Sequence, residues 1–416
     1  MNTLAPMLMR ALTVCAVFLA APRYVVDTRF EAGSAGRVEI VSGSHIRVAV
    51  VGETDQDKRN RQPSWFYFRL DNAAGSELTI ELDQLAGEYN YRQHDGSGLR
   101  NMRPVYSYDN KAWEHFESSE WNAASSSIKV RLKPAKDRVW IARQPPYTTA
   151  HLEELLKEIG GSSYLRREAV GKTVGGRPIL LLTVTNPAVP DRNKKVIWLM
   201  ARQHAWESGT SWVCEGALRF LVSADPAAVR IRDAYVFKIF PMADPDGVAR
   251  GGVRFNAHGY DLNRNWDTAD PQRMPEIFAQ RKAMLEWIDG GGRMDLFLSL
   301  HNTESADFIS GPVAAGGPEV RNIALRFSRL LDQTSFYAPK GPRDGPAALQ
   351  SAEKGRLTVY EYLFRERKAP AFLMELMVDT NPKLSRPPTV ADRLKFGAAL
   401  VRCMAGALSG DSDLDR

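Results

Sequence analysis

Between residues 29 and 143 apolar and polar positions alternate over short runs, which is the period expected of half-buried β-strands. Clusters of Gly, Asn, Asp and Ser separate these runs, which cover residues 38–41, 46–51, 65–70, 78–82, 126–132 and 138–142. Short strands at this spacing are typical of a β-sandwich. We therefore predict a small all-β sandwich domain over residues 23–143.

The pattern changes after residue 143. Residues 144–149 predict a linker, because Pro146 can end a strand. Beyond it, strongly apolar runs alternate with segments of helical period. The apolar runs cover residues 179–184, 196–200, 235–241, 296–300 and 371–376, and the helical segments cover residues 151–159, 211–222, 275–288, 319–331 and 392–408. This alternation predicts an α/β domain, a sheet flanked by helices, over residues 144–409, with a tail at 410–416.

Charge and cysteine content exclude some classes of protein. The 416 residues include 55 Lys and Arg against 49 Asp and Glu, a net charge of +6. This excess is small and no dense basic run carries it, so we expect no nucleic-acid partner. The cysteines at 15, 214 and 403 are too few and too scattered for a disulfide framework or a cysteine-based zinc site.

The N-terminus resembles a targeting segment. Arg10 precedes an uncharged run over residues 11–21, which is shorter than the ~20 apolar residues that span a bilayer. We therefore interpret residues 1–22 as a signal peptide and expect no stable membrane span. If it is cleaved, the protein is periplasmic or secreted; otherwise it is cytoplasmic.

Polar residues with metal-binding chemistry follow two of the predicted strands. His204 and Glu207 come after the run 196–200, and His301 comes directly after the run 296–300. An imidazole and a carboxylate at this spacing can converge on one cation, and the second imidazole completes a His/Glu/His set. Three protein ligands leave a position open for water, as in catalytic zinc sites. Taken alone, His204 and Glu207 are better explained as an ordinary surface pair, and His301 alone could be a hydrogen-bonded histidine at a strand end.

Glu375 lies among Phe, Leu and Met in the last predicted strand. An unpaired buried carboxylate is costly, so its presence there favours a function. A carboxylate is needed to take the proton from a zinc-activated water, and Glu375 is the candidate general base.

A third group of residues suits a carboxylate-bearing substrate. Arg264 offers a planar fork that binds a carboxylate through two hydrogen bonds, and Asn263 can donate a further one. Upstream, Arg254 could stabilise an oxyanion formed by attack on a peptide carbonyl. A surface loop with ordinary salt bridges is the alternative interpretation of these residues.

Taken in order, these elements resemble the zinc metallocarboxypeptidase family over residues 148–409. The resemblance rests on His204-x-x-Glu207, Asp261-Leu-Asn263-Arg264-Asn265-Trp266, His301 and Glu375. The N-terminal part is similar to the β domain of the cytosolic carboxypeptidase subfamily, which suggests a bacterial-type member. Its matching segments are Phe30-Glu-Ala-Gly33, Trp65-Phe-Tyr-Phe68, Met102-Arg-Pro-Val-Tyr-Ser107 and Pro145-Pro-Tyr147.

The resemblance implies a carboxypeptidase-like mixed sheet and one zinc ion per chain. It implies zinc ligands at His204, Glu207 and His301, a general base at Glu375, a clamp for the terminal carboxylate at Asn263 and Arg264, and carbonyl polarisation by Arg254. Enzymes of the subfamily remove C-terminal glutamates. Arg356 lies in a Lys-Gly-Arg element similar to one near their specificity pocket, so it is a candidate for binding an acidic side chain. A solvated arginine at a helix start is an equal alternative.

One residue departs from the subfamily. Trp206 stands where small residues are usual, so we expect a reshaped mouth of the site.

The leading hypothesis is a zinc-dependent carboxypeptidase that acts on the C-terminus of peptides or proteins and prefers acidic residues. The alternatives are a zinc amidase on cell-wall peptides or N-acyl amino acids, and a non-catalytic peptide-binding protein. The sequence predicts no oligomeric state.

Overall fold

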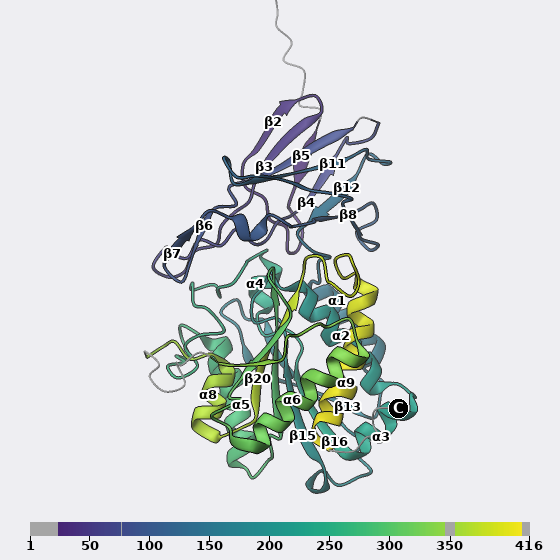
Figure 1. Ribbon diagram of the computed structural model, residues 1–416, viewed down its shortest axis with the longest axis vertical. Helices are drawn as coiled ribbons and strands as arrows, with labels where there is room; N and C mark the ends of the chain where they lie inside the picture. Colours follow the sequence, from purple (N-terminus) through teal and green to yellow (C-terminus); the bar gives the residue numbers. More distant parts are fainter. Residues whose placement is uncertain (1–23, 76, 346–353, 410–416) are drawn as a thin grey trace, which may run out of the picture.

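The computed structural model describes residues 24–75, 77–345 and 354–409 (Figure 1). The predicted signal peptide at residues 1–22 and the predicted tail at 410–416 lie outside these described residues. The β domain stacks on one end of the α/β domain, and the chain passes between them once, after residue 143.

The β domain consists of two five-stranded sheets packed face to face. In spatial order the first contains β1 (Val25–Asp27), β4 (Tyr67–Asp71), β12 (Val139–Ala142), β8 (Val105–Ser107) and β9 (Glu114–His115). The second contains β10 (Glu120–Asn122), β11 (Ser127–Leu132), β5 (Leu78–Asp83), β3 (His45–Ala49) and β2 (Val38–Ser42). Alternate residues such as Val48, Phe68 and Ile80 are fully buried between the sheets. The predicted sandwich is therefore the observed architecture.

A separate hairpin, β6 (Gly87–Tyr89) and β7 (Arg92–His94), lies at the edge of the β domain that faces the α/β domain (Figure 1). Its two turn residues, Asn90 and Tyr91, have φ values of 47° and 61°. Positive φ at both central positions is the geometry that matches the twist of a two-residue hairpin. The sequence analysis missed this hairpin because its strands are short and largely polar.

The α/β domain is built on an eight-stranded sheet. In spatial order its strands are β13 (Leu165–Lys172), β14 (Pro178–Val184), β16 (Tyr235–Phe240), β15 (Lys195–Met200), β17 (Leu296–Thr303), β20 (Ala371–Met377), β18 (Phe308–Gly311) and β19 (Pro342–Asp344). The central strands β16, β15, β17 and β20 are parallel, whereas β13 pairs with β14, β14 with β16, and β18 with β20 in antiparallel fashion; the edge strand β19 is parallel to β18. The sheet is thus mixed, as expected.

Helices cover both faces of this sheet. The helical segments are α1 (Thr149–Ile159), η2 (Asp191–Asn193), α2 (Ser208–Val222), α3 (Pro226–Ala234), α4 (Pro245–Ala249), α5 (Pro275–Asp289), α6 (Gly317–Thr334), α8 (Val359–Arg367) and α9 (Val390–Ser409), with η1 (Ser97–Leu99) in the β domain. Leu199 of β15 packs in the core that includes α1, α2, α6 and α9, while Trp198 packs in the core that includes α5 and α8. Among the described residues no helix has both the length and the apolar character needed to cross a membrane.

Two details differ from the expectations. β17 does not end at Leu300 but continues to Thr303, because its pairing with β20 continues to that residue, so His301 lies inside a strand. The segment predicted as a linker is packed rather than loose: Gln144 is 2 % exposed, and the Tyr147 ring lies 4.8 Å from that of Trp212. The two domains therefore meet in a buried seam.

Candidate active site

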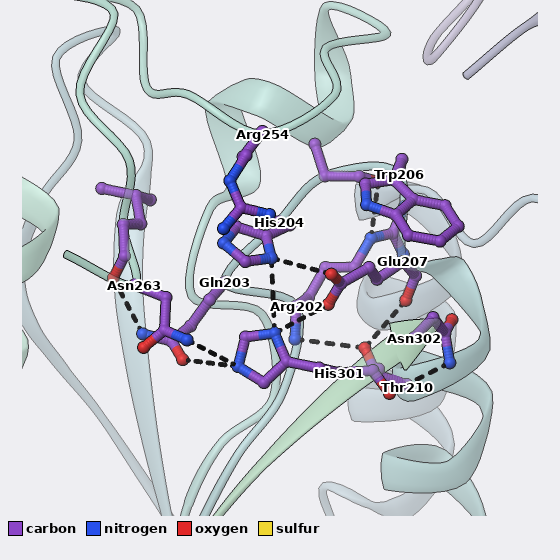
Figure 2. A network of polar contacts seen from close by, with 12 residues as sticks. Arg202, Gln203, His204, Trp206, Glu207, Thr210, Arg254, Asn263, His301 and Asn302 are labelled. Atoms are coloured by element: carbon purple, nitrogen blue, oxygen red, sulfur yellow. Dashed lines mark hydrogen bonds and ion pairs between the residues drawn. The ribbon is translucent and has the colours of Figure 1, made fainter. Parts of the chain in front are cut away.

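Three side chains with metal-binding atoms converge where β15 and β17 run side by side (Figure 2). His204 Nδ1 lies 2.7 Å from Glu207 Oε1, His301 Nδ1 lies 3.1 Å from Glu207 Oε2, and the two Nδ1 atoms are 3.3 Å apart. All three residues are buried. A nitrogen, oxygen and nitrogen donor set at this separation fits a zinc ion with a position left open.

The loop after β15 that carries His204 and Glu207 is held by a buried arginine. Arg202 donates to Ala205 O at 2.8 Å, to Tyr147 O at 3.1 Å and to Ser211 Oγ at 3.1 Å. Burial lowers the pKa of its guanidinium to about 10. Arg202 also has a φ of 61°, a strained value that the surrounding contacts must maintain. The sequence analysis assigned it no role.

Two polar residues orient the imidazoles. His204 Nε2 lies 3.1 Å from Asp261 Oδ1, and His301 Nε2 lies 3.1 Å from Gln203 Oε1. When each Nε2–H donates to its oxygen, each Nδ1 lone pair is left for a cation. Burial opposes ionisation of Asp261, but the charges of Arg254 and His204 hold its pKa well below the usual range. A metal-binding imidazole needs a hydrogen-bond acceptor for its other ring nitrogen. That requirement was the signal by which the sequence analysis could have found Asp261 and Gln203.

Glu375 lies beside the metal-binding group. In the parallel pairing of β17 and β20 it is the partner of His301, so the two side chains project from the same face of the sheet. Its Oε2 is buried and has no hydrogen-bond partner among the described residues. Burial, followed by the charge of Glu207, raises the pKa of Glu375 well above its usual range. A dication bound nearby would act in the opposite direction.

These residues line a cleft of about 480 Å³ between the two domains. The α/β domain contributes the metal-binding group, Glu375, Arg254, Asn263 and Arg264, and the β domain contributes residues that include Gln62, Pro63, Ser64, Tyr89, His94 and Leu99. The structure thus brings nearly all the predicted site residues to one cavity. It also adds a wall from the β domain that the sequence analysis did not anticipate.

The predicted substrate-binding residues lie along one side of this cleft. Arg254 Nε donates to Asp261 Oδ2 at 2.7 Å, and Arg264 Nη1 donates to Asn263 O at 2.7 Å. Asn263 Oδ1 accepts from the backbone N–H of Val359 at 3.3 Å, which fixes the orientation of its amide.

Arg356 is placed differently. It lines a smaller, adjoining cavity of about 170 Å³, which Arg254 and Arg264 also reach. There its Nη2 donates to Asn90 Oδ1 of the β6–β7 hairpin at 3.2 Å.

Comparison with known families agrees with this arrangement. Residues 152–309 match the zinc carboxypeptidase family, and residues 26–143 match the cytosolic carboxypeptidase N-terminal domain. The α/β domain belongs to the zinc carboxypeptidase family. Zinc is the cofactor of that family, and the donor set described above fits it.

Curated relatives of this chain include cytosolic carboxypeptidase 6 of Caenorhabditis elegans, 31% identical over 281 residues, and human cytosolic carboxypeptidase 1, 34% identical over 309 residues. The alignments cover 63% and 65% of this chain but 58% and 24% of those relatives. Among solved structures, a metallo-carboxypeptidase from Burkholderia cenocepacia is 26% identical, with a TM-score of 0.80. That match covers 93% of this chain and 99% of the solved chain.

Two aromatic residues complete the carboxypeptidase cleft. Tyr360, in the first turn of α8, is 2 % exposed and lines the cleft, and burial raises the pKa of its hydroxyl. Trp206 also lines the cleft, but most of its side chain packs in an apolar cluster with Trp65 of the β domain and Val253. The bulky residue in the metal-binding loop is therefore part of the seam between the domains.

Proposed function

We propose that this chain is a zinc-dependent carboxypeptidase that hydrolyses the last peptide bond of peptides or proteins. The observation that carries the proposal is the composition of one cleft. It holds a His/Glu/His donor set, a half-buried carboxylate whose buried Oε2 has no hydrogen-bond partner among the described residues, and groups suited to a carboxylate and an oxyanion. Membership of the zinc carboxypeptidase family supports the same reaction.

In this proposal His204, Glu207 and His301 hold the zinc ion. When bound, zinc supplies a Lewis acid that polarises the substrate carbonyl and lowers the pKa of water. The Glu375 carboxylate accepts a proton from the attacking water. It then delivers that proton to the nitrogen of the leaving amino acid as the C–N bond breaks. The products are a shortened peptide with a new carboxylate and a free amino acid.

The arginines position the substrate. Asn263 and Arg264 bind the terminal carboxylate, which places the last peptide bond at the reacting groups. Arg254 donates a hydrogen bond to the carbonyl oxygen as negative charge develops on it. Its Nε is already used by Asp261, so the terminal nitrogens are the groups for this task.

We further propose a preference for acidic C-terminal residues. Three guanidinium groups, those of Arg254, Arg264 and Arg356, line the smaller cavity. Arg356 forms no ion pair within the described residues, and its hydrogen bond there goes to the neutral amide of Asn90. A Glu or Asp side chain in this cavity would therefore meet a cation that is free to bind it.

The test is mass spectrometry of a peptide mixture with varied C-termini, incubated with the zinc-loaded protein. The Glu375→Gln variant is the control for contaminating peptidases. Losses of single residues confined to Glu and Asp termini would support both proposals, and the Arg356→Ala variant would then lose the preference. Losses from all termini would contradict the acidic preference alone. No loss would contradict the carboxypeptidase proposal, and cell-wall peptides and N-acyl amino acids would become the substrates to test.

A further inference from the structure

The loop that carries Arg254, residues 250–260, is pressed against the β domain at both ends. Ala32 N donates to Ala249 O at 3.0 Å just before this loop, and Gln56 N donates to Gly259 O at 3.1 Å near its end. A Cβ atom on Gly251 would lie 2.5 Å from the carbonyl oxygen of Gly33. Only a residue without a side chain allows the two backbones to approach so closely.

One carboxylate of the β domain binds the centre of this loop. Glu53 Oε2 accepts the backbone N–H groups of Val253 at 2.9 Å, Arg254 at 2.5 Å and Phe255 at 3.0 Å. Its other oxygen pairs with Arg250. Hydrogen bonds to an ionised carboxylate are about twice as strong as neutral ones, and three consecutive amides aimed at one oxygen fix the backbone conformation. Glu53 therefore determines where the Cα atom of Arg254 lies.

A second β-domain residue holds the Arg254 side chain. The guanidinium carbon lies 5.2 Å from the ring centroid of Tyr89, at the tip of β6. The guanidinium makes a second contact through Nε, which donates to Asp261 Oδ2. A ring face and a carboxylate together fix the plane of the guanidinium. Within the described part of the chain no protein group accepts a hydrogen bond from its terminal nitrogens, and Arg254 lines the cleft.

We propose that Glu53 and Tyr89 are positioning residues of the active site. Through them the β domain holds Arg254 at the place where it meets the substrate carbonyl. The inference rests on the proposed function only in the task it gives to Arg254. It assigns the β domain a part in the reaction itself, because the α/β domain alone lacks two of the contacts that aim this guanidinium.

The first experiment compares steady-state kinetics of the full chain. Tyr89→Leu removes the ring face and is expected to lower kcat about 3- to 30-fold, the range that corresponds to a partly desolvated cation–π contact, with KM little changed. Tyr89→Phe keeps the ring and should retain the wild-type kcat. Tyr108→Leu is the matched control, because Tyr108 lies under Lys136 elsewhere in the β domain. Equal losses in the Leu and Phe variants would contradict the proposal.

The second experiment asks whether Tyr89 acts through Arg254. In an Arg254→Ala background, Tyr89→Leu should cost less than about twofold in kcat, because the group that it positions is gone. If the cost is the same in both backgrounds, Tyr89 contributes independently of Arg254 and the proposal is wrong.

The third experiment does not need activity. Hydrogen exchange of the Val253, Arg254 and Phe255 amides should accelerate about tenfold or more in Glu53→Gln, while the amides of β15 keep their wild-type protection. Unchanged exchange at the three loop amides would contradict the role of Glu53. If the wild-type protein cleaves no peptide, the proposed function fails, and this measurement still decides whether Glu53 holds the loop.

Discussion

The two halves of the cleft are built in different ways. The metal-binding half takes its residues, His204, Glu207, His301 and Glu375, from neighbouring strands of one sheet or the loop that follows them. The half that bears the guanidinium groups takes Arg254, Arg264 and Arg356 from irregular segments, and β-domain residues hold Arg254 and Arg356. Groups that must converge on one point are thus carried by a rigid sheet, whereas groups that face the substrate depend on the junction of two domains.

The seam that joins the domains contains a cluster of buried apolar side chains from both domains. Trp206 and Val253 of the α/β domain share an apolar cluster with Trp65 and other β-domain residues. Arg143, at the end of the β domain, is buried with its Nη2 3.6 Å from a carboxylate oxygen of Glu304. This packing gives the substrate-facing half the rigidity that its loops lack by themselves.

The largest effect is expected from breaking the metal-binding half. His301→Ala removes one of three ligands and should abolish both zinc binding and peptide hydrolysis, measured as bound zinc after desalting and as turnover. Glu375→Gln should retain zinc and still lower kcat about 100- to 10,000-fold, since it removes only the proton-transferring group. Full zinc content in His301→Ala would rule out the proposed ligand set. His258→Ala, which changes an exposed imidazole outside this group, is the control.

The next largest effect is expected at the seam. Trp206 is 5 % exposed, and its replacement by Ala should lower the free energy of unfolding by about 3–5 kcal/mol, measured by urea denaturation. Trp121→Ala, which truncates a half-buried side chain on β10 within the β domain, should cost less. If Trp206→Ala costs no more than Trp121→Ala, the seam contributes less to stability than its packing indicates.

The same contrast explains what the sequence could predict. The sheet strands could be predicted, and the candidate metal ligands that converge in the structure could be proposed, because their signals are local: an apolar run, a following polar residue and a short spacing. Glu53 and Tyr89 carried no such signal. Glu53 contacts an amide 200 residues further along the chain, and in the sequence it is one acidic residue in a polar stretch. Only the three-dimensional structure reveals a residue whose role depends on a contact across two domains.

A smaller effect is expected from the protonation of His115, a residue of β9. Burial, with a smaller contribution from Arg393 across the seam, lowers its pKa from 6.5 to about 4. The unfolded chain therefore binds more protons between these pH values, and the folded state loses stability as the pH falls from about 6.5 to 4. The full loss is about 3 kcal/mol.

Other groups at the seam change stability with the opposite sign. Burial raises the pKa of Glu304 and Asp379, so their protonation favours the folded state as the pH falls. The measurement is therefore the difference in unfolding free energy between the wild type and His115→Gln at several pH values. The wild type should lose its advantage over the variant on acidification. A difference that is constant from pH 7 to pH 4 would show that His115 has the same pKa in the folded and unfolded states, which would contradict this prediction.

The smallest effect is expected where the two halves touch. Asp261 uses Oδ1 for His204 in the metal-binding half and Oδ2 for Arg254 in the other half. Asp261→Asn keeps the shape of the side chain but leaves one acceptor oxygen for three donors, because the backbone N–H of Asn263 also donates to Oδ1. If the remaining oxygen serves Arg254, His204 loses its orienting partner, and zinc affinity should fall about 10- to 100-fold in a chelator competition.

If the oxygen instead serves His204, zinc affinity is retained and the loss appears in kcat at saturating zinc, because Arg254 has lost the carboxylate that fixes its plane. The two readouts therefore distinguish which half depends more on this carboxylate. A variant with wild-type zinc affinity and wild-type kcat would contradict both roles. It would mean that each half is held by its own domain contacts, with Tyr89 and Glu53 sufficient for Arg254 and the strand geometry sufficient for His204.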